Sequence, residues 1–435
     1  MRSLFDEFKP MTSAEWKNLI ARDLKGAPYD SLVWHTECGF GIEPFYNHES
    51  LHEQYLPAFS HTEWQIGVEE NDTTAEALNQ KLLRQLNRGA SSITVTIGKL
   101  DPYVVFNGIR LDAIRSVFFV NQQNVVKLIT YIETTYDLQS VNCCIFTESA
   151  TDGGKWFAAE TAKLFPYKNI SFITADALPY HNMGCTAVYE VALIFSMFLA
   201  RLDEAGDKIP SSPLALRTGI SADYFVQLAK LRAVRRLWNV LREDFGLENE
   251  LYIIAQTSLT NKTISDSHSN LLRTTVEAMA AVAGGCNELV VLPFDVLFPV
   301  DAALSQRLAI NQQLIISAES HLDKMADVGC GSYYIENLTD MIAEKALEFL
   351  RDFESNGGFV ECEQKGLFRA EIARQAQRRE TLVASGEQVV VGINRYRNKN
   401  DHTAFNSGDI ERLKRQGISN AAVNYELHNF LNTNA

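Results

Sequence analysis

The sequence predicts an α/β fold, a (β/α)8 TIM barrel with an extended arm before it and a helical extension after it. Short runs of β-branched and aromatic residues alternate with longer helical runs between residues 61 and 348. Strands that alternate with helices pair in parallel through right-handed crossovers. Roughly seven or eight such units suit a barrel, which usually takes about 250 residues. A doubly wound open sheet is the alternative, but no complete GxGxxG or phosphate-binding loop supports it.

Residues 1–60 are interpreted as an N-terminal arm. Thr12 and Ser13, followed by Glu15, are typical of a capped helix start, and Gly26 ends the helix after Leu24. The rest of the arm reads as extended segments and turns rich in aromatic residues. An arm this apolar should lie on another surface. We expect that surface to be a partner subunit, with the chain's own main domain as the alternative.

The barrel region, residues 61–348, divides into expected strands and helices. The expected strands are Ser91–Gly98, Ser116–Val120, Val141–Thr147, Asn169–Ala175, Pro213–Gly219, Leu251–Thr257 and Leu289–Asp295. The expected helices include Thr74–Arg88, Gln123–Thr134, Cys185–Leu202, Ala222–Arg242, Ser269–Ala283 and Ala302–Ser317. Residues 349–435 read as a charged, helical C-terminal extension that fades into a polar tail.

The helix expected at Ala222–Arg242 combines an apolar face with a run of basic side chains. Its apolar face carries Tyr224, Leu228, Leu231, Trp238 and Leu241. The basic residues Lys230, Arg232, Arg235, Arg236 and Arg242 fill the remainder. Such a run is typical of a solvated outer face. A basic surface for an acidic partner or a ligand phosphate is the alternative.

Composition limits the partners and the compartment. The formal net charge of −14 argues against a nucleic-acid or anionic-membrane partner. Seven cysteines without a CxxC pair indicate a reduced, intracellular compartment. The N-terminus has no apolar core of a signal peptide, and the longest apolar run, Val191–Ala200, reads as a buried helix of about half a membrane span. We therefore expect a cytoplasmic protein.

Motifs for metal or nucleophilic chemistry are weak. The segment His48–His52 matches HExxH by letter, but it lies between Pro44 and Pro57, with little room for the helix that a zinc site needs. We interpret these residues as surface histidines and expect no metal site. Cys330, in a glycine-flanked turn, reads as a small loop residue rather than a nucleophile.

Three residues at expected strand ends are candidates for acid–base or anion chemistry. Glu148 and Asp295 could each serve as a general base in a barrel mouth, although strand-end carboxylates more often cap the next helix. Arg217 lies near the end of its strand, where a guanidinium would bind a carboxylate or phosphate through paired hydrogen bonds. A salt bridge between barrel loops is the equal alternative.

Several segments resemble the methylmalonyl-CoA mutase family. They are Leu271–Gly285 preceded by Gln256–Ser258, then Gly331–Ala346, Ala229–Trp238, His181–Leu193 and Val389–Tyr396. The segment Leu4–Gly26 resembles the start of the small subunit of the heterodimeric enzymes. The resemblance covers nearly the whole chain, with the motifs in the family's order.

The resemblance implies a hollow barrel. In the catalytic chains of this family, coenzyme A threads along the barrel axis, and a separate flavodoxin-like domain holds adenosylcobalamin over the C-terminal mouth. Homolysis of the Co–C bond starts a radical rearrangement between methylmalonyl-CoA and succinyl-CoA, so the cofactor carries the hard chemistry. Arg217 matches the family's substrate-carboxylate arginine.

The sequence departs from the catalytic chains at residues that would touch substrate. The family's histidine, two residues before the glutamine of Gln-Thr-Ser, is replaced by Ile254, whose side chain can neither donate a hydrogen bond nor transfer a proton. Catalytic chains also carry Trp-x-Ile-Arg-Gln-Tyr before the first strand. Here Trp64 and Ile66 match, but the Arg, Gln and Tyr are replaced by Gly67, Val68 and Glu69.

The cobalamin-binding features of the family are missing as well. The chain ends at Ala435, before any C-terminal cobalamin-binding domain. Asp266-Ser267-His268 begins like the cobalamin-ligand motif DxHxxG, but Leu271 holds the glycine position. We expect Asp266 or Ser267 to cap the following helix instead.

These features predict the small, non-catalytic subunit of a heterodimeric, adenosylcobalamin-dependent methylmalonyl-CoA mutase. The chain would bind no cofactor, and a homologous large catalytic subunit would carry adenosylcobalamin. A remnant acyl-CoA site would comprise Arg217, Gln256, Thr257 and Ser258.

Two alternatives stay open. One is a stand-alone barrel enzyme that uses Asp295, Glu148 and Arg217. The other is a regulatory subunit that binds acyl-CoA without chemistry, which requires an open barrel axis. Bulky strand residues decide this by pointing inward or outward: Phe118, Phe119, Phe146, Phe172 and Phe294.

Overall fold

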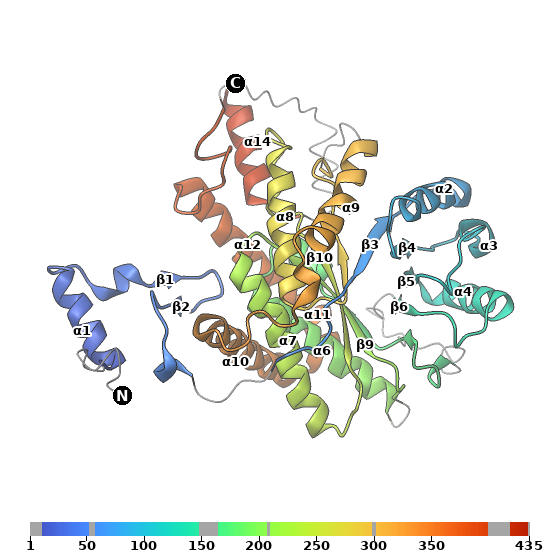
Figure 1. Ribbon diagram of the computed structural model, residues 1–435, viewed down its shortest axis with the longest axis horizontal. Coiled ribbons are helices and arrows are strands. Elements are labelled where there is room, and N and C mark those ends of the chain that lie inside the picture. The colour runs from blue at the N-terminus through green and yellow to red at the C-terminus, as the bar shows by residue number, and fades with distance from the viewer. Residues whose placement is uncertain are drawn as a thin grey trace, which may run out of the picture.

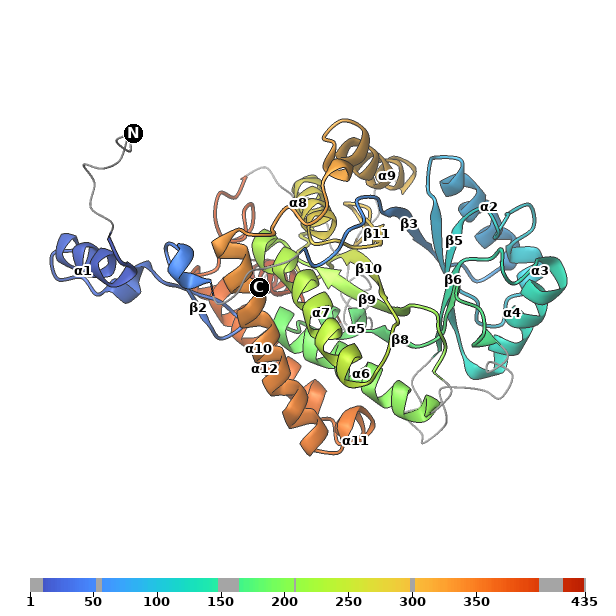
Figure 2. The ribbon, with the colours of Figure 1, turned by 60° about the horizontal axis from the view of Figure 1, so that its bottom comes forward.

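A parallel β-barrel forms the centre of the molecule, and a narrow N-terminal arm extends from one side of it (Figures 1 and 2). The computed structural model describes residues 11–51, 57–147, 164–206, 209–297, 302–398 and 418–433. Statements below about what the fold contains refer to these ranges.

The barrel strands follow one another in the order β7-β6-β5-β4-β3-β11-β10-β9-β8, all in parallel. They are β3 (Gln65–Glu70), β4 (Ser92–Thr96), β5 (Arg115–Val120), β6 (Cys143–Thr147), β7 (Ile170–Ser171), β8 (Thr174–Asp176), β9 (Leu214–Ile220), β10 (Leu251–Thr257) and β11 (Glu288–Val290). At the two ends of this order stand β7 and β8, yet only Phe172 and Ile173 separate them in sequence. One chain segment therefore pairs with β6 and with β9, and this closes the sheet. The predicted (β/α)8 barrel is confirmed.

Helices cover the barrel in two groups. Outside β3 to β6 lie α2 (Ala75–Leu86), α3 (Pro102–Val105) and α4 (Gln122–Thr135). The other side carries α5 (Leu178–Asn182), α6 (Ala187–Ala205), α7 (Tyr224–Asp244), α8 (Ser269–Ala283) and α9 (Ala302–Ala318). Two separate apolar cores fill the space between strands and helices, one for each group. The apolar run Val191–Ala200 lies in α6, as predicted for a buried helix. No helix in the described ranges is both long and apolar enough to cross a membrane.

Most predicted elements agree with the structure to within a few residues, but one strand was misplaced. The segment around Gln65–Glu70, expected to lie before the first strand, is itself β3 and pairs with β4 and β11. It has only one fully apolar inward position, Gly67, and two charged residues at its end, so it lacks the usual strand composition.

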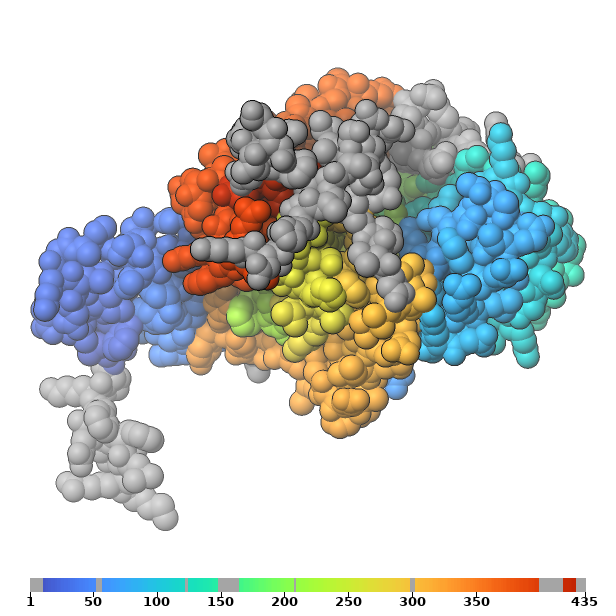
Figure 3. Space-filling model, turned by 90° about the horizontal axis from the view of Figure 1, so that it is seen from above, coloured from blue at the N-terminus to red at the C-terminus, as the bar shows by residue number. Residues whose placement is uncertain are grey.

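The N-terminal arm divides into two parts. Its first helix, α1 (Ser13–Asp23), begins with the predicted capping box of Thr12 and Glu15 and buries none of its residues. Next come a 3-10 turn η1 (Tyr29–Leu32), the antiparallel pair β1 (Trp34–His35) and β2 (Gly41–Ile42), and a second 3-10 turn η2 (His48–Ser50). This second part packs on the chain's own main core through Cys38, Phe40 and Tyr46. This part of the arm therefore lies on the chain's own main domain, which was the alternative to a partner subunit. Helix α1, in contrast, projects from the body (Figure 3).

Of the C-terminal helices, the first packs beside α6 and α7, the second beside α6, and the last two pack on each other. They are α10 (Tyr333–Ser355), α11 (Gly358–Gln364), α12 (Leu367–Ser385) and α14 (Ala421–Thr433), with a 3-10 turn η4 (Leu322–Lys324) before α10. Since α10 runs through residue 348 without interruption, the chain shows no structural break where the barrel region was expected to end.

The basic run of α7 is not a solvated face, so that prediction is wrong. Lys230 and Arg232 are fully buried, and Arg235 is 9% exposed. Carboxylates from distant segments explain this. Lys230 pairs with Glu190 of α6 at 2.9 Å, and Arg232 pairs with Asp327 and Glu336 at 2.7 and 2.9 Å. Buried charges are tolerated when they are paired in this way.

Candidate functional site

Alternation along the strands defines the side chains that face the barrel axis. On β9 and β10, Leu214, Leu216, Leu251 and Ile253 belong to the outer core. Successive side chains on a strand point to opposite faces. The axis is therefore lined by the intervening residues, which are Ala215, Arg217 and Gly219 of β9 and Tyr252, Ile254 and Gln256 of β10.

An apolar layer crosses the barrel at the level of Ile254. Ile254 is fully buried in a cluster with Val117, Cys144, Phe146 and Ala215, which come from β5, β6 and β9. The rings of Phe119 and Phe146 stack with centroids 4.8 Å apart. Of the bulky residues in question, Phe119 and Phe146 thus point inward, whereas Phe118 and Phe172 join the outer core. The fifth, Phe294, stacks on His268 beyond β11.

Arg217 lies beside this layer and is held by acidic side chains. Its guanidinium donates two hydrogen bonds of 2.9 Å to the carboxylate of Asp176 and one of 3.4 Å to Glu69. It also lies 4.1 Å from the ring centre of Phe119. Burial opposes its charge, but the carboxylates of Asp176 and Glu69 outweigh burial and raise the pKa of Arg217. The arginine is charged and already neutralised within the protein.

The three residues that replace the family's Arg, Gln and Tyr lie on β3. Glu69 reaches Arg217, as described above, and Val68 packs on the outer core. A Cβ atom added at Gly67 would lie 2.9 Å from Oε1 of Glu288 and from a methyl group of Val290. A larger residue at position 67 would therefore have to displace Glu288.

Gln256, Thr257 and Ser258 do not form one cluster with Arg217. Gln256 faces the axis, is 4% exposed, and has an Oε1 atom without a hydrogen-bond partner in the described ranges. The hydroxyl of Thr257 accepts a hydrogen bond from the backbone N–H of Leu292 at 2.8 Å, on the outer side of the strand. Ser258 belongs to a separate buried network.

That network joins Ser258 to His181 and Glu190, and sequence reasoning missed it. The Ser258 hydroxyl lies 2.8 Å from Nε2 of His181, whose Nδ1 lies 3.0 Å from Glu190. Lys230 also contacts Glu190, whose pKa is about 2 because Lys230 and His181 outweigh the effect of burial. A carbon at Gly219 would lie 2.2 Å from His181, so glycine is required there. Nothing in the sequence signals these partners, which lie up to 77 residues apart.

The barrel interior contains a second ionisable group on β11, next to Ile254 of the neighbouring strand. Glu288 is fully buried, and burial raises its pKa to about 7. The Tyr252 hydroxyl donates to Glu288 at 3.2 Å, and the guanidinium of Arg115 stacks 3.7 Å from the Tyr252 ring centre. Around it, three inward polar atoms have no partner in the described ranges: the hydroxyls of Thr94 and Thr174 and Nε of Arg115.

The remaining predicted residues lie away from the axis or outside the described part of the chain. Glu148 lies outside it, and Asp295 is buried beyond β11. The N-cap residue of α8 is His268, without a side-chain cap, and not Asp266 or Ser267 as predicted; Asp266, two residues earlier, accepts a hydrogen bond from the backbone N–H of Ser269 at 3.2 Å. Burial raises the pKa of the Cys330 thiol, contrary to what a nucleophile needs.

The HExxH segment also falls partly outside the described ranges. His48 and Glu49 lie in the single 3-10 turn η2, and His52 is not described. In the described ranges, no group of three His, Cys, Asp or Glu side chains is arranged to hold a metal ion.

Comparisons with known proteins agree with this geometry. The methylmalonyl-CoA mutase family model matches residues 150–424. The chain is 30% identical to the methylmalonyl-CoA mutase small subunit of Porphyromonas gingivalis, over 91% of this chain and 71% of that protein. It is 26% identical to the methylmalonyl-CoA mutase of Rhizobium meliloti, over 93% and 68%. Against the mitochondrial enzyme of Mus musculus the identity is 26%, over 92% and 64%, so the chain spans just under two thirds of that relative.

Proposed function

The chain belongs to the methylmalonyl-CoA mutase family, and on that premise we propose that it is the small, non-catalytic subunit of a heterodimeric, adenosylcobalamin-dependent enzyme. The complex would interconvert methylmalonyl-CoA and succinyl-CoA. One observation carries the proposal: Arg217, at the place of the family's substrate-binding arginine, is already bound to Asp176 and Glu69.

A substrate carboxylate would have to compete with these two internal carboxylates. Asp176 binds Arg217 through both of its oxygens, and Arg217 is only 8% exposed. Three of the five N–H donors of Arg217 are therefore already used, and a substrate carboxylate at the remaining two would lie beside the carboxylates of Asp176 and Glu69, which repel it. Beside it, Ile254 lies in register with Arg217 on β9 and with Glu288 on β11, where the catalytic chains have a histidine. Substrate binding and proton transfer are therefore both opposed at this position.

The residues of this chain do not fit adenosylcobalamin. Asp266 accepts a hydrogen bond from the backbone N–H of Ser269, Leu271 replaces the glycine of the ligand motif, and His268 stacks on Phe294 with ring centres 5.4 Å apart. We assign no step of the reaction to a cobalamin held here. The cofactor would belong to the partner subunit.

The arm supports the proposed partnership. Helix α1 buries none of its residues and leaves Trp16 41% exposed, which is costly for a large aromatic side chain unless a partner covers it. The Porphyromonas gingivalis relative is named a small subunit, and a small subunit implies a larger partner. The absence of disulfides among the seven cysteines suits a cytoplasmic complex.

Association with a homologous large subunit tests this proposal. Sedimentation of the mixture should show a one-to-one complex, and Trp16→Ala should weaken it at least about tenfold, as expected for a buried aromatic anchor. The matched control is Tyr103→Ala, which removes a 54% exposed aromatic side chain on α3, away from the arm. No complex, or equal weakening by both variants, would contradict the proposed role of the arm.

Acyl-CoA binding without chemistry is a second candidate, favoured by the unpartnered polar atoms inside the barrel. Thr94 and Thr174 supply hydroxyl groups without a partner in the described ranges. Buried polar groups are nearly always hydrogen-bonded, so water or the amide-bearing chain of coenzyme A would be needed here. Calorimetric titration with coenzyme A distinguishes this candidate from a purely structural subunit. Binding would favour the acyl-CoA-binding role, whereas a closed layer of Ile254, Phe119 and Phe146 should prevent binding.

A further inference from the structure

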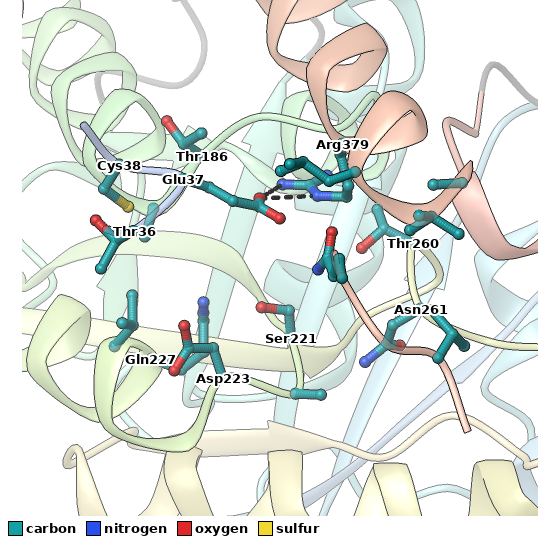
Figure 4. Close-up of a pocket in the computed structure, with 18 of the residues that line it drawn as sticks. Thr36, Glu37, Cys38, Thr186, Ser221, Asp223, Gln227, Thr260, Asn261 and Arg379 are labelled. Atoms are coloured by element: carbon teal, nitrogen blue, oxygen red, sulfur yellow. Dashed lines mark hydrogen bonds and ion pairs between the residues drawn. The ribbon is translucent and has the colours of Figure 1, made fainter. Parts of the chain in front are cut away.

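A pocket of about 420 Å³ lies between the arm, the barrel loops and the C-terminal helices, outside the barrel axis (Figure 4). We call it the arm pocket. Its walls come from Thr36–Cys38 of the arm, the first residues of α6, the start of α7 from Ser221 to Gln227, and α12 at Arg379. Four distant parts of the chain thus build one cavity.

The wall of the arm pocket contains a buried acceptor without a donor. Gln227 is 4% exposed, and its Oε1 atom has no hydrogen-bond partner in the described ranges. Gln388, on the opposite side of the pocket, also has an Oε1 atom without a partner there. A buried amide oxygen left unpaired costs about 1–3 kcal/mol, so each calls for an N–H or O–H group from elsewhere.

A carboxylate lies one helical turn from Gln227. Asp223 precedes α7, and the backbone N–H of Gln227 donates to its carbonyl oxygen at 2.9 Å. Burial raises the pKa of Asp223 to about 6, the N–H of Val226 lowers it, and the nearby Glu37 raises it further. In the described ranges no lysine or arginine pairs with Asp223. Asp223 is therefore a half-buried carboxylate without a paired cation in the described ranges.

The one arginine in the wall is already used. Arg379 donates to Glu37 at 2.9 and 2.6 Å and to the carbonyl oxygen of Gly184 at 3.3 Å. The two histidines in the wall also have acidic partners: His35 contacts Asp30, and His181 contacts Glu190. With these charges matched, Asp223 and the rim residue Glu387 leave the pocket negative.

The rest of the wall is apolar. Ala187 and Val226 line one side, and Leu382 and Val383 of α12 line another. Pockets that combine an apolar wall with a few convergent polar groups are typical of small-molecule sites. Here the two buried polar atoms without a partner in the described ranges, Oε1 of Gln227 and Oε1 of Gln388, are both acceptors, and the uncompensated charge is negative.

We propose that the arm pocket binds a small primary alkylammonium ion, whose N–H groups donate to Asp223 and Gln227 and whose alkyl chain packs on the walls of α7 and α12. A charge-assisted hydrogen bond to Asp223 would supply the missing cation, and the bond to Gln227 would satisfy the orphan oxygen. Closure by the arm, held through Glu37 and Arg379, would shield the ion pair from water. This inference does not depend on the proposed mutase function.

Titration of the full chain with butylammonium, followed by calorimetry and ligand-detected NMR, tests the proposal. Butylammonium should bind with saturation, whereas butyrate should not bind and butanol should bind at least tenfold more weakly. Binding of butyrate, or no binding of butylammonium, would overturn the proposal.

Three variants locate the site. Asp223→Asn removes the charge but keeps a good helix cap, so the fold should persist while affinity falls at least tenfold. Gln227→Leu removes the orphan acceptor and should weaken binding several-fold without loss of thermal stability. Glu243→Gln, an exposed carboxylate on the same helix, should leave binding unchanged. Unchanged binding in Asp223→Asn, or equal loss in Glu243→Gln, would exclude the arm pocket as the site.

Discussion

The carboxylate of Asp176, from β8, holds the guanidinium of Arg217, from β9, through two hydrogen bonds of 2.9 Å. Under the proposed function, this pair occupies the guanidinium that would otherwise bind a substrate carboxylate. Because the pair lies inside the barrel, its removal should lower the free energy of unfolding.

We predict that Asp176→Ala lowers the free energy of unfolding by about 3 kcal/mol, because it leaves Arg217 buried with only the weaker contact to Glu69. Chemical denaturation measures the change. The double variant Asp176→Ala with Arg217→Met should recover most of this loss, since no buried charge is then unpaired. A single variant within about 0.5 kcal/mol of the wild type would contradict the structural role of the pair.

Restoring the family's histidine should not restore function. Ile254→His places a polar ring in a fully buried apolar cluster and should cost about 2–3 kcal/mol of unfolding free energy. The variant alone should still show no turnover of methylmalonyl-CoA, because Arg217 remains occupied. Ile254→Val is the control and should cost about 1 kcal/mol. Turnover by the histidine variant would mean that this barrel is one substitution from activity.

Glu288 makes stability depend on pH. Its pKa in the folded chain is raised to about 7, so the folded state holds its proton between about pH 4.5 and pH 7 while the unfolded state releases it. Stability from this residue is therefore present below that window and is lost as pH rises through it. Glu288→Gln should be more stable than the wild type by up to about 3 kcal/mol at pH 8 and nearly equal to it at pH 4.5. Denaturation at both values measures the difference, and a pH-independent gap would contradict the assignment.

Two basic residues of α7 should behave differently. Lys230→Met leaves Glu190 buried without its cation and should cost about 3 kcal/mol. Arg242→Met, in the last turn of the same helix and only half-buried, should change stability by less than about 0.5 kcal/mol. Thermal denaturation compares the two, and equal effects would mean that burial of Lys230 is not maintained in solution.

The sequence predicts the barrel well because its elements are local. Helix α8 begins and ends at the predicted residues Ser269 and Ala283, and β10 at Leu251 and Thr257. The barrel strand β3 was not among the expected strands, because its polar composition hides it, although the closed barrel itself was predicted.

The candidate site is less predictable than the fold, since the role of each site residue depends on partners that are distant in sequence. Arg217 was identified, but its partners Asp176 and Glu69 lie 41 and 148 residues away. The same separation explains the error over α7, where an arginine run looks identical whether water or a distant carboxylate pairs with it. In contrast, Ile254 was identified at the place of the family's histidine from a single aligned residue, and the structure places it facing the barrel axis.

The most direct test of the central claim is turnover of methylmalonyl-CoA with added adenosylcobalamin, measured first with this chain alone and then with a homologous large subunit. We expect no succinyl-CoA from the chain alone and full activity in the mixture, unchanged when Gln256→Ala is introduced in this chain. Turnover by the chain alone would contradict it, because the occupied Arg217 and the apolar Ile254 could then not have silenced this barrel.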